Sequence, residues 1–237
     1  MRYILLLLCA LAPDLAAAQS ALPEPLTCLL RPNRSSDIGA DTGAIVSDVK
    51  VRRTNRVKQG DLLVQLDDRI ARADLGKSLI IRDTTSAKLK RAEAVTAGRS
   101  ISAEEVGTLR AEAAMAAADY QRAKLQLDRT QILAPFDGTI ADVMTEAGQQ
   151  TNSQPLVQLI DTQRLRAEMV FPAEAFGKVI AGDTLNLAVD LTGARVAASV
   201  ATIDDYIDAS SNSFTVVAEI DNSTGALPAG TSCRFDR

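Results

Sequence analysis

The sequence predicts a mainly β protein that carries a long α-helical hairpin and ends in a small β-barrel. Three observations lead to this fold class. Leu63–Leu66 and Leu156–Leu159 both read LVQL, and each closes a similar passage of short alternating strands. Residues 68–133 between them contain no Pro and few Gly and are rich in helix-forming residues. After the second copy, apolar residues alternate in segments of strand length.

Neither copy of the β unit contains enough strands to bury a core by itself. We therefore expect the two copies to pack face to face as one small flattened barrel, with the hairpin inserted between them. The predicted parts are a signal peptide (1–18), an N-terminal segment paired with the C-terminal strand (19–40), the first half of the β unit (41–67), the hairpin (68–133), the second half (134–162) and the β-barrel domain (163–237). The barrel strands are expected at 184–191, 195–203, 213–221 and 231–235.

The N-terminus has the pattern of a cleaved signal peptide. A basic start (Met1-Arg2) is followed by the apolar run Ile4–Ala12 and by small residues before Gln19. The run is too short to span a bilayer, and Leu8 stands before Cys9, where a lipoprotein signal needs a small residue. We therefore expect an exported, periplasmic protein without a lipid anchor that begins near Gln19.

The composition argues against several classes of function. The 237 residues include no His and carry a net charge of −4. This composition excludes His-based triads, disfavours catalytic zinc and gives no electrostatic basis for binding nucleic acid. The acidic pairs Asp67-Asp68 and Asp204-Asp205 are interpreted as turn and edge residues. We therefore predict no catalytic residue, no metal site, no cofactor and no nucleic-acid partner.

Two cysteines, Cys28 and Cys233, remain once the signal peptide with its Cys9 is removed. In an oxidising compartment they are most simply one disulfide, which would place the two ends of the mature chain side by side. Two buried free thiols are the alternative. A disulfide that closes so long a loop would stabilise the fold by roughly 4 kcal/mol in the chain-entropy model.

The second arm of the hairpin has the pattern of an amphipathic helix that starts at a capping box, Ser102 to Glu105. Its apolar residues recur at alternating spacings of three and four, which is a heptad seam: Val106, Leu109, Ala113, Ala116, Tyr120, Ala123 and Leu127. The first arm, residues 69–97, shows no single register, because Thr84–Ser86 interrupt it. The arms meet at the turn 98–101, and about 29 residues in each arm would form a rod of roughly 43 Å.

Several motifs resemble those of periplasmic adaptor proteins, also called HlyD-like membrane fusion proteins. The first half of the β unit carries the similarity in GAI (43–45) and VKQG (57–60), and the second half carries it in APFDGTI (134–140), Gly148 and LVQL. The resemblance implies that both halves form one lipoyl-like domain, split by an antiparallel coiled coil. The family has Gly in the turn before VKQG, where this chain has Thr54-Asn55. Asn tolerates left-handed backbone, so we expect the turn to persist.

The resemblance also implies a function. Such adaptors belong to tripartite efflux pumps and link an inner-membrane transporter, here of the resistance–nodulation–division (RND) type, to an outer-membrane channel protein. They are not enzymes, and they act as homo-oligomeric rings, hexameric in the assembled pump. Larger adaptors have a further membrane-proximal domain for which this chain has no room, so we expect a short form.

The resemblance extends to the hairpin tip. Adaptors that dock onto a channel share an Arg, a Leu four residues later and a Ser seven residues after that. Arg91, Val95 and Ser102 have this spacing, with Val in place of Leu. The resemblance therefore assigns channel docking to these three residues. Ser102 is also explained as a helix cap, and Arg91 as a solvated cation.

Other interpretations of the same residues stay open. An adaptor of an ABC-type exporter or of a secretion system would share these features, because the transporter is what differs. A coiled-coil interaction protein outside any pump would also carry the hairpin. A biotin or lipoate carrier would place its modified Lys on a tight turn between the β halves, where this chain has an insertion of 66 residues.

Overall fold

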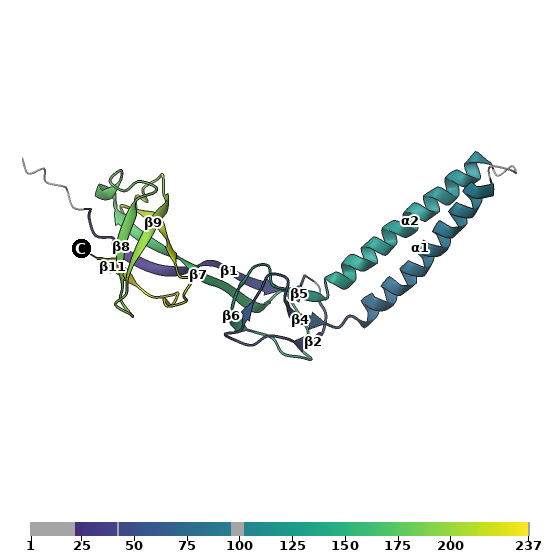
Figure 1. The fold of residues 1–237 in the computed structure, drawn as a ribbon, viewed down its shortest axis with the longest axis horizontal. Helices are drawn as coiled ribbons and strands as arrows, with labels where there is room; N and C mark the ends of the chain where they lie inside the picture. The colour runs from purple at the N-terminus through teal and green to yellow at the C-terminus, as the bar shows by residue number, and fades with distance from the viewer. Residues whose placement is uncertain (1–21, 42, 96–101, 237) are drawn as a thin grey trace, which may run out of the picture.

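The structure is a computed structural model that describes residues 22–41, 43–95 and 102–236. Figure 1 shows an elongated molecule in which two β modules lie in line and a helical hairpin projects from one of them. The predicted fold class, mainly β with a long helical hairpin, is therefore confirmed. The signal peptide predicted at 1–18 lies outside the described residues.

The described residues form two long helices, a series of strands and one 3-10 turn. In chain order the elements are β1 (Thr27–Gly39), β2 (Val46–Val49), β3 (Arg56–Val57), β4 (Leu62–Leu66), α1 (Arg69–Val95), α2 (Ala103–Asp128), β5 (Gln131–Leu133), β6 (Gly138–Val143), β7 (Pro155–Pro172), the turn η1 (Ala173–Ala175), β8 (Thr184–Val189), β9 (Arg195–Ile203), β10 (Ser213–Asp221) and β11 (Cys233–Phe235). We call the part built around β2–β6 the root module, because the hairpin starts there, and the part built around β8–β11 the end module.

Strands β1 and β7 form a long antiparallel ribbon that runs through both modules. Thr27 pairs with Val170 in the end module, and Gly39 pairs with Pro155 in the root module. Figure 1 shows the two strands side by side between the modules. The register of the ribbon shifts between Pro32 and Arg34. The modules are thus connected by continuous hydrogen-bonded strands and not by a flexible linker.

A buried asparagine holds the chain at the junction of the modules. Asn222 is 2% exposed, and its side-chain amide donates to Thr162 O at 2.8 Å and to Leu227 O at 2.9 Å. Its Oδ1 accepts a hydrogen bond from Leu227 N at 2.9 Å. These bonds tie β7, close to the register shift, to the loop after β10. A buried amide with every group satisfied stabilises one geometry, because any rearrangement would leave it without partners.

The end module is a curved sheet around its own core. Its strand order is β11-β8-β9-β10-β7, and β1 pairs with β7. Alternate residues of β7, such as Leu165, Met169 and Phe171, are fully buried in the core. The sheet is not closed into the barrel that we expected, because β1 and the C-terminal segment meet at the isolated bridge between Leu29 and Ser232. With three residues, β11 is too short to form a full ladder with β8 on one edge and β1 on the other.

The root module contains both copies of the repeated β unit. One of its sheets has the order β2-β4-β5, and the other combines β3, β6, the first part of β7 and the end of β1. The apolar residues of both LVQL segments lie in one shared core, where none is more than 4% exposed: Leu63, Val64, Leu66, Leu156, Val157 and Leu159. The prediction that the two separated halves fold as one unit is confirmed. They form two packed sheets rather than a closed barrel.

The turn before VKQG persists, but in a different way from the one expected. Thr54, and not Asn55, adopts the left-handed backbone, with φ of 71°. The side chain of Asn55 instead accepts a hydrogen bond from Arg52 N at 2.8 Å. A β-branched residue is strained at positive φ, so this side-chain hydrogen bond helps to hold the turn.

The two ends of the described chain are joined covalently. Cys28 of β1 and Cys233 of β11 form a disulfide with their Cα atoms 5.0 Å apart. The predicted disulfide is confirmed, and the alternative of two free thiols does not hold. Close to it, Leu30 N donates to Thr231 O at 2.8 Å and Gly230 N donates to Leu30 O at 2.7 Å. The disulfide therefore joins β1 to β11 at the place where the sheet of the end module is left open.

Replacing both Cys28 and Cys233 with Ala should destabilise the end module selectively. We expect the free energy of unfolding to fall by up to about 4 kcal/mol, because the unfolded chain loses the constraint of a very long loop. The helical signal in circular dichroism should persist at low temperature, because the core of the root module contains neither cysteine. Equal thermal unfolding of the variant and the oxidised protein would contradict this assignment.

Gly138 permits a close approach of β6 to β7. A Cβ atom at this position would lie 2.5 Å from Ile160 O and 3.1 Å from Leu159 Cδ1. We expect Gly138→Ala to lower the free energy of unfolding by about 1–3 kcal/mol, because the backbone must move to relieve the overlap. Gly76→Ala is the matched control, since a Cβ there meets nothing within 4 Å and should stabilise α1 by up to about 1 kcal/mol. Denaturant titration measures both, and a neutral Gly138→Ala would refute the steric argument.

Candidate functional site: the helical hairpin, its tip and its root

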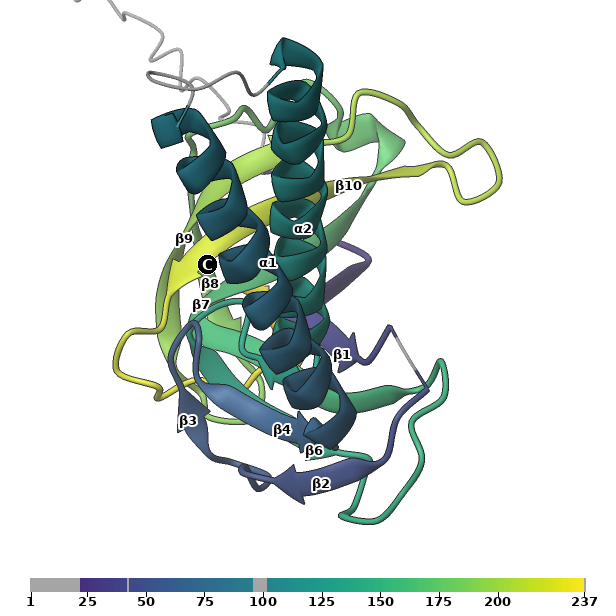
Figure 2. The same cartoon turned by 90° about the vertical axis from the view of Figure 1, so that its right-hand side faces the viewer.

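Helix α2 directs its predicted seam toward α1. All seven seam residues, from Val106 to Leu127, are buried or half-buried, whereas every other residue of α2 is exposed. Ala116 and Ala123 are the buried ones. Figures 1 and 2 show the two helices side by side and antiparallel. The predicted antiparallel coiled coil is confirmed, and its seam has the predicted register.

Helix α1 has a matching seam that the sequence analysis missed. Its less exposed residues include a run at spacings of four and three: Ala71, Leu75, Ser78, Arg82, Thr85, Leu89 and Ala92. The three central residues of this run are polar, so a search for apolar periodicity finds no register there. The run nevertheless has the heptad period, and it passes directly through the Thr84–Ser86 segment that we took for an interruption.

Two contacts between the helices define how the arms align. The guanidinium carbon of Arg82 lies 4.1 Å from the centroid of the Tyr120 ring, which is a cation–π contact. Nearer the tip, Arg110 binds Glu93 at 2.8 Å. A polar residue at a seam position favours one register over slipped alternatives. The residues that obscured the pattern in the sequence therefore specify the register of the hairpin.

The residues assigned to docking lie at the tip of the hairpin, far from both modules (Figure 1). Arg91 is exposed in the last turns of α1, which ends at Val95. Ser102 is exposed just before α2, and its Oγ accepts a hydrogen bond from Glu105 N at 3.1 Å. The predicted cap is present. The side chain of Val95 and the turn 96–101 lie outside the described residues, and docking stays a prediction.

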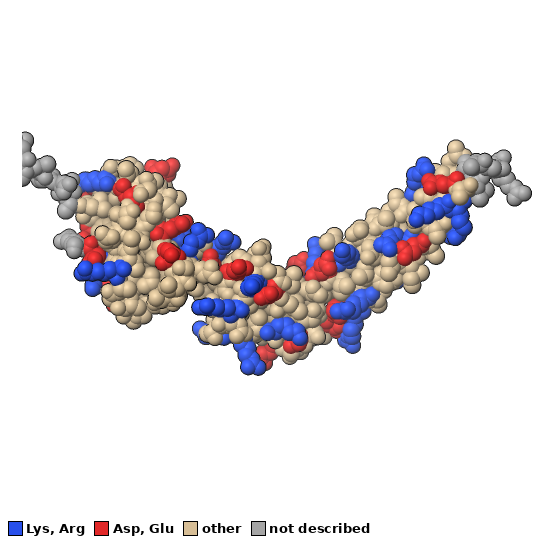
Figure 3. Space-filling model, in the orientation of Figure 1, with Lys and Arg blue, Asp and Glu red and all other residues tan. Residues whose placement is uncertain are grey.

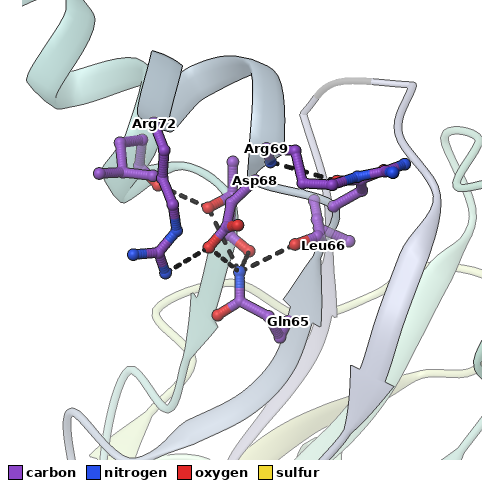
Figure 4. Close-up of polar contacts among 8 residues, drawn as sticks. Gln65, Leu66, Asp68, Arg69 and Arg72 are labelled. Atoms are coloured by element: carbon purple, nitrogen blue, oxygen red, sulfur yellow. Dashed lines mark hydrogen bonds and ion pairs between the residues drawn. The ribbon is translucent and has the colours of Figure 1, made fainter. Parts of the chain in front are cut away.

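The hairpin is anchored where the chain leaves β4 and returns to β5. Leu66 N donates to Thr130 O at 2.8 Å. Gln65 Nε2 donates to Leu66 O at 2.8 Å and to Thr130 O at 3.2 Å, and it lies 3.4 Å from a carboxylate oxygen of Asp68. Figure 4 shows Gln65 between the end of β4 and the start of α1. This one amide links the outgoing strand, the returning strand and the first helix.

Two ion pairs stiffen the same joint. Arg69 binds Asp67 and Arg72 binds Asp68, each at 2.6 Å. Hydrogen bonds from Arg69 lower the pKa of the Asp67 carboxyl from 3.8 to about 2, and the hydrogen bond from Arg72 lowers the pKa of Asp68. We interpreted this acidic pair as turn residues and missed its role. The spacing of four between Asp68 and Arg72 was the available signal, because such pairs meet on a helix.

Within the described part of the chain, no group of three or more His, Cys, Asp or Glu side chains is placed to hold a metal ion. The cleft between the modules is lined by polar residues of both, among them Arg56, Asp137 and Gln163. Figure 3 shows basic and acidic side chains interspersed over this face of the molecule. None of the helices in the described ranges is long and apolar enough to cross a membrane.

Comparison with curated proteins finds two informative relatives. An uncharacterized protein of Haemophilus influenzae is 25% identical, over 84% of this chain and 53% of its own length. The multidrug resistance protein MdtA of Klebsiella pneumoniae is 27% identical, over 92% of this chain and 60% of its own length. The chain therefore spans little more than half the length of these relatives. No family model matches the sequence.

Solved structures show the same fold more clearly. A MacA–MexA chimera with the α-hairpin domain of Pseudomonas aeruginosa MexA superposes with a TM-score of 0.80 at 20% identity, over 90% of this chain and 78% of the chimera. The membrane fusion protein Spr0693 of Streptococcus pneumoniae superposes with a TM-score of 0.74 at 16% identity, over 90% of this chain and 100% of that one. The predicted resemblance to membrane fusion proteins is therefore confirmed, and the fold is theirs.

The ion pairs at the hairpin root should open in acid. Because the pKa of Asp67 is lowered, the stability that its ion pair contributes is present above the ordinary value of 3.8 and is lost as the pH falls toward about 2. We expect amides 67–72 to exchange hydrogen faster at pH 2.5 than at pH 5, after correction for the intrinsic exchange rate. The control is Asp67→Asn, in which the corrected difference should shrink. An equal difference in both proteins would contradict the assignment.

Proposed function

We propose that this chain is a periplasmic adaptor of an export system, which links a transporter in the inner membrane to a channel in the outer membrane. Its relative MdtA is named a multidrug resistance protein, and one structural relative is named a membrane fusion protein. In this role the chain makes and breaks no covalent bond and is not an enzyme. Its function is mechanical, since it holds two partners at a defined separation.

The anchored hairpin is the observation that carries this proposal. Helix α1 has 27 residues, which corresponds to a rod of about 40 Å. One end of the rod is held by the core of the root module and by the polar joint around Gln65, Asp67 and Asp68. A rod fixed at one end holds its tip at a defined distance and direction, as a bridge between two separated partners requires.

We propose that the partners are an RND-type transporter, toward the end modules, and an outer-membrane channel, toward the tips. Copies of the chain would surround the export path as a ring, hexameric in the assembled pump. Each single contact in such a ring can be weak, because the neighbouring contacts hold the partners at high effective concentration. Export through the signal peptide at 1–18 would place the chain in the periplasm, and a disulfide suits that oxidising compartment.

The tip would bind the channel through Arg91, Val95 and Ser102. Arg91 offers an exposed cation without an ion-pair partner among the described residues. Ser102 uses an oxygen lone pair to cap α2, which leaves its hydroxyl proton available for a carbonyl of the partner. An apolar residue between two polar ones would add contact area to this pair of hydrogen-bonding groups.

Charge reversal at the tip tests the docking. A photo-crosslinking residue placed at position 95 should capture an outer-membrane channel protein in cells, identified by mass spectrometry. We expect Arg91→Asp or Ser102→Arg to reduce the captured amount at least tenfold, because each change removes a hydrogen bond and adds a repulsive or bulky group at the contact. Arg91→Asp should unfold like the parent, since Arg91 is exposed. Ser102→Arg should lower the free energy of unfolding by about 1 kcal/mol, because it removes the cap of α2.

The matched control for this experiment is Lys124→Asp, a charge reversal on the same rod near its root. It should leave the capture unchanged. If capture persists in both tip variants, or if the control abolishes it equally, the docking assignment is wrong.

A further inference from the structure

The polar cleft at the junction of the two modules has no part in the proposed function. It encloses about 260 Å³. Its lining comes from β3 and β6 of the root module, from β7, which belongs to both modules, and from the loop after β10 in the end module. The polar side chains that matter below are Arg56, Lys58, Thr139, Thr162, Gln163 and Ser223.

The basic groups of this cleft have no anionic partner of their own. Arg56 and Lys58 are exposed, and neither forms an ion pair with any residue that the structure describes. They stand two residues apart on β3, so their side chains project from the same side of the strand. Two cations that line one cleft repel each other, and an anion between them would turn this repulsion into attraction.

The guanidinium of Arg56 reaches across the boundary between the modules. A Cβ atom built on Gly225, in the loop after β10, would lie 3.6 Å from Arg56 Nη2. Figure 2 shows this loop next to β3. The φ of Gly225 is 69°, a backbone conformation that suits glycine. Arg56 therefore belongs to the root module but lies against the end module.

The neutral groups of the cleft are also free to bind a ligand. The side chains of Thr139, Thr162 and Gln163 form no hydrogen bond within the described ranges. Ser223 Oγ donates to Asp221 at 3.2 Å, which is long for a hydroxyl donor. Because a hydroxyl group rotates, Ser223 can turn its proton toward the cleft. Hydroxyl and amide donors are thus present beside the two cations.

The carboxylate that lines the cleft is engaged by the backbone. Asp137 Oδ1 accepts a hydrogen bond from Gln59 N at 2.7 Å. The charged groups of the lining are then two cations, Arg56 and Lys58, and this one anion, which leaves a net charge of +1. The whole chain has a net charge of −4. The cleft therefore attracts anions locally, although the chain as a whole repels them.

We propose that this cleft binds a small oxyanion of the phosphate or pyrophosphate type, and that the bound anion joins the two modules. A guanidinium can donate two parallel hydrogen bonds to the oxygens of such a group, and Lys58 adds a second positive charge. The free hydroxyl and amide groups can donate to the remaining oxygens. Because the donors come from both modules, the anion binds one relative orientation of them best and stabilises it.

Calorimetric titration of the purified chain with inorganic pyrophosphate, at constant ionic strength, tests the site. We expect saturable binding of one anion per chain and a higher midpoint of thermal unfolding. Arg56→Gln combined with Lys58→Gln should weaken the binding at least tenfold, because both charged donors are lost. No saturable binding and no thermal shift, or equal binding by this variant, would overturn the proposal. The test needs neither a transporter nor a channel, so its outcome is independent of the proposed function.

The matched control removes the same number of charges from the turn just before β3. Arg52 and Arg53 are exposed and do not line the cleft. Arg52→Gln combined with Arg53→Gln should leave the affinity for pyrophosphate unchanged. An equal loss in both double variants would show general attraction to basic residues and refute a defined site.

Two further probes identify the source of the anion. Inorganic phosphate represents the free ion, and glycerol phosphate represents the phosphate group of a larger molecule, such as a lipid headgroup. Tighter binding of one of them, lost with Arg56→Gln and Lys58→Gln, would support the site and assign its source. Failure of both, together with failure of pyrophosphate, would overturn it.

Spin-label distance measurements test whether the anion joins the modules. The labels are attached at Ala147→Cys in the root module and Leu191→Cys in the end module, both exposed, in a chain with Cys9→Ala and the disulfide intact. We expect saturating pyrophosphate to narrow the distribution of distances, and to leave it unchanged when Arg56→Gln and Lys58→Gln are also present. A distribution that stays the same with the anion bound would show that one module alone holds it, which would refute the bridging role.

Discussion

The burial of two separated segments in one apolar core is the constraint on which the rest of the molecule depends. Leu63–Leu66 and Leu156–Leu159 each contribute three buried residues to the root module, and neither half has enough strands to form a core alone. When the two halves pack together, Leu66, just before the hairpin, and Thr130, just after it, come within hydrogen-bonding distance. The hairpin between them must then start and finish at one place. Its position is therefore a consequence of the packing of the β halves.

Polar interactions fix the geometry of the joints between the hairpin, the root module and the end module. Gln65 connects the outgoing and returning strands to the start of α1, while Asn222 ties β7 to a loop of the end module. The Asn222 amide bonds only to backbone groups, and the Gln65 Nε2 donates to two backbone carbonyls, so both favour the one geometry that supplies these partners. Together with the ribbon of β1 and β7, they make the path from the end module to the hairpin a series of hydrogen-bonded joints. A mechanical role requires such continuity, because a flexible joint would transmit neither distance nor direction.

The hairpin shows how one periodicity can serve two surfaces. Its inner seam is buried within the chain, with Arg82 and Tyr120 selecting the register, and its outer faces repeat the same heptad spacing with exposed Ile80 and Leu125. An amphipathic helix in a closed hairpin needs only the first of these stripes.

The sequence alone determined the fold class, the insertion of a hairpin into a repeated β unit, the seam of α2 and the pairing of Cys28 with Cys233. These features follow from local periodicity, composition and the simplest pairing of two exported cysteines. Only the tertiary structure revealed the seam of α1, the left-handed Thr54 and the open edge of the end module. Each of these depends on a partner distant in sequence or on a choice between neighbouring residues, and periodicity along one segment carries no information about either.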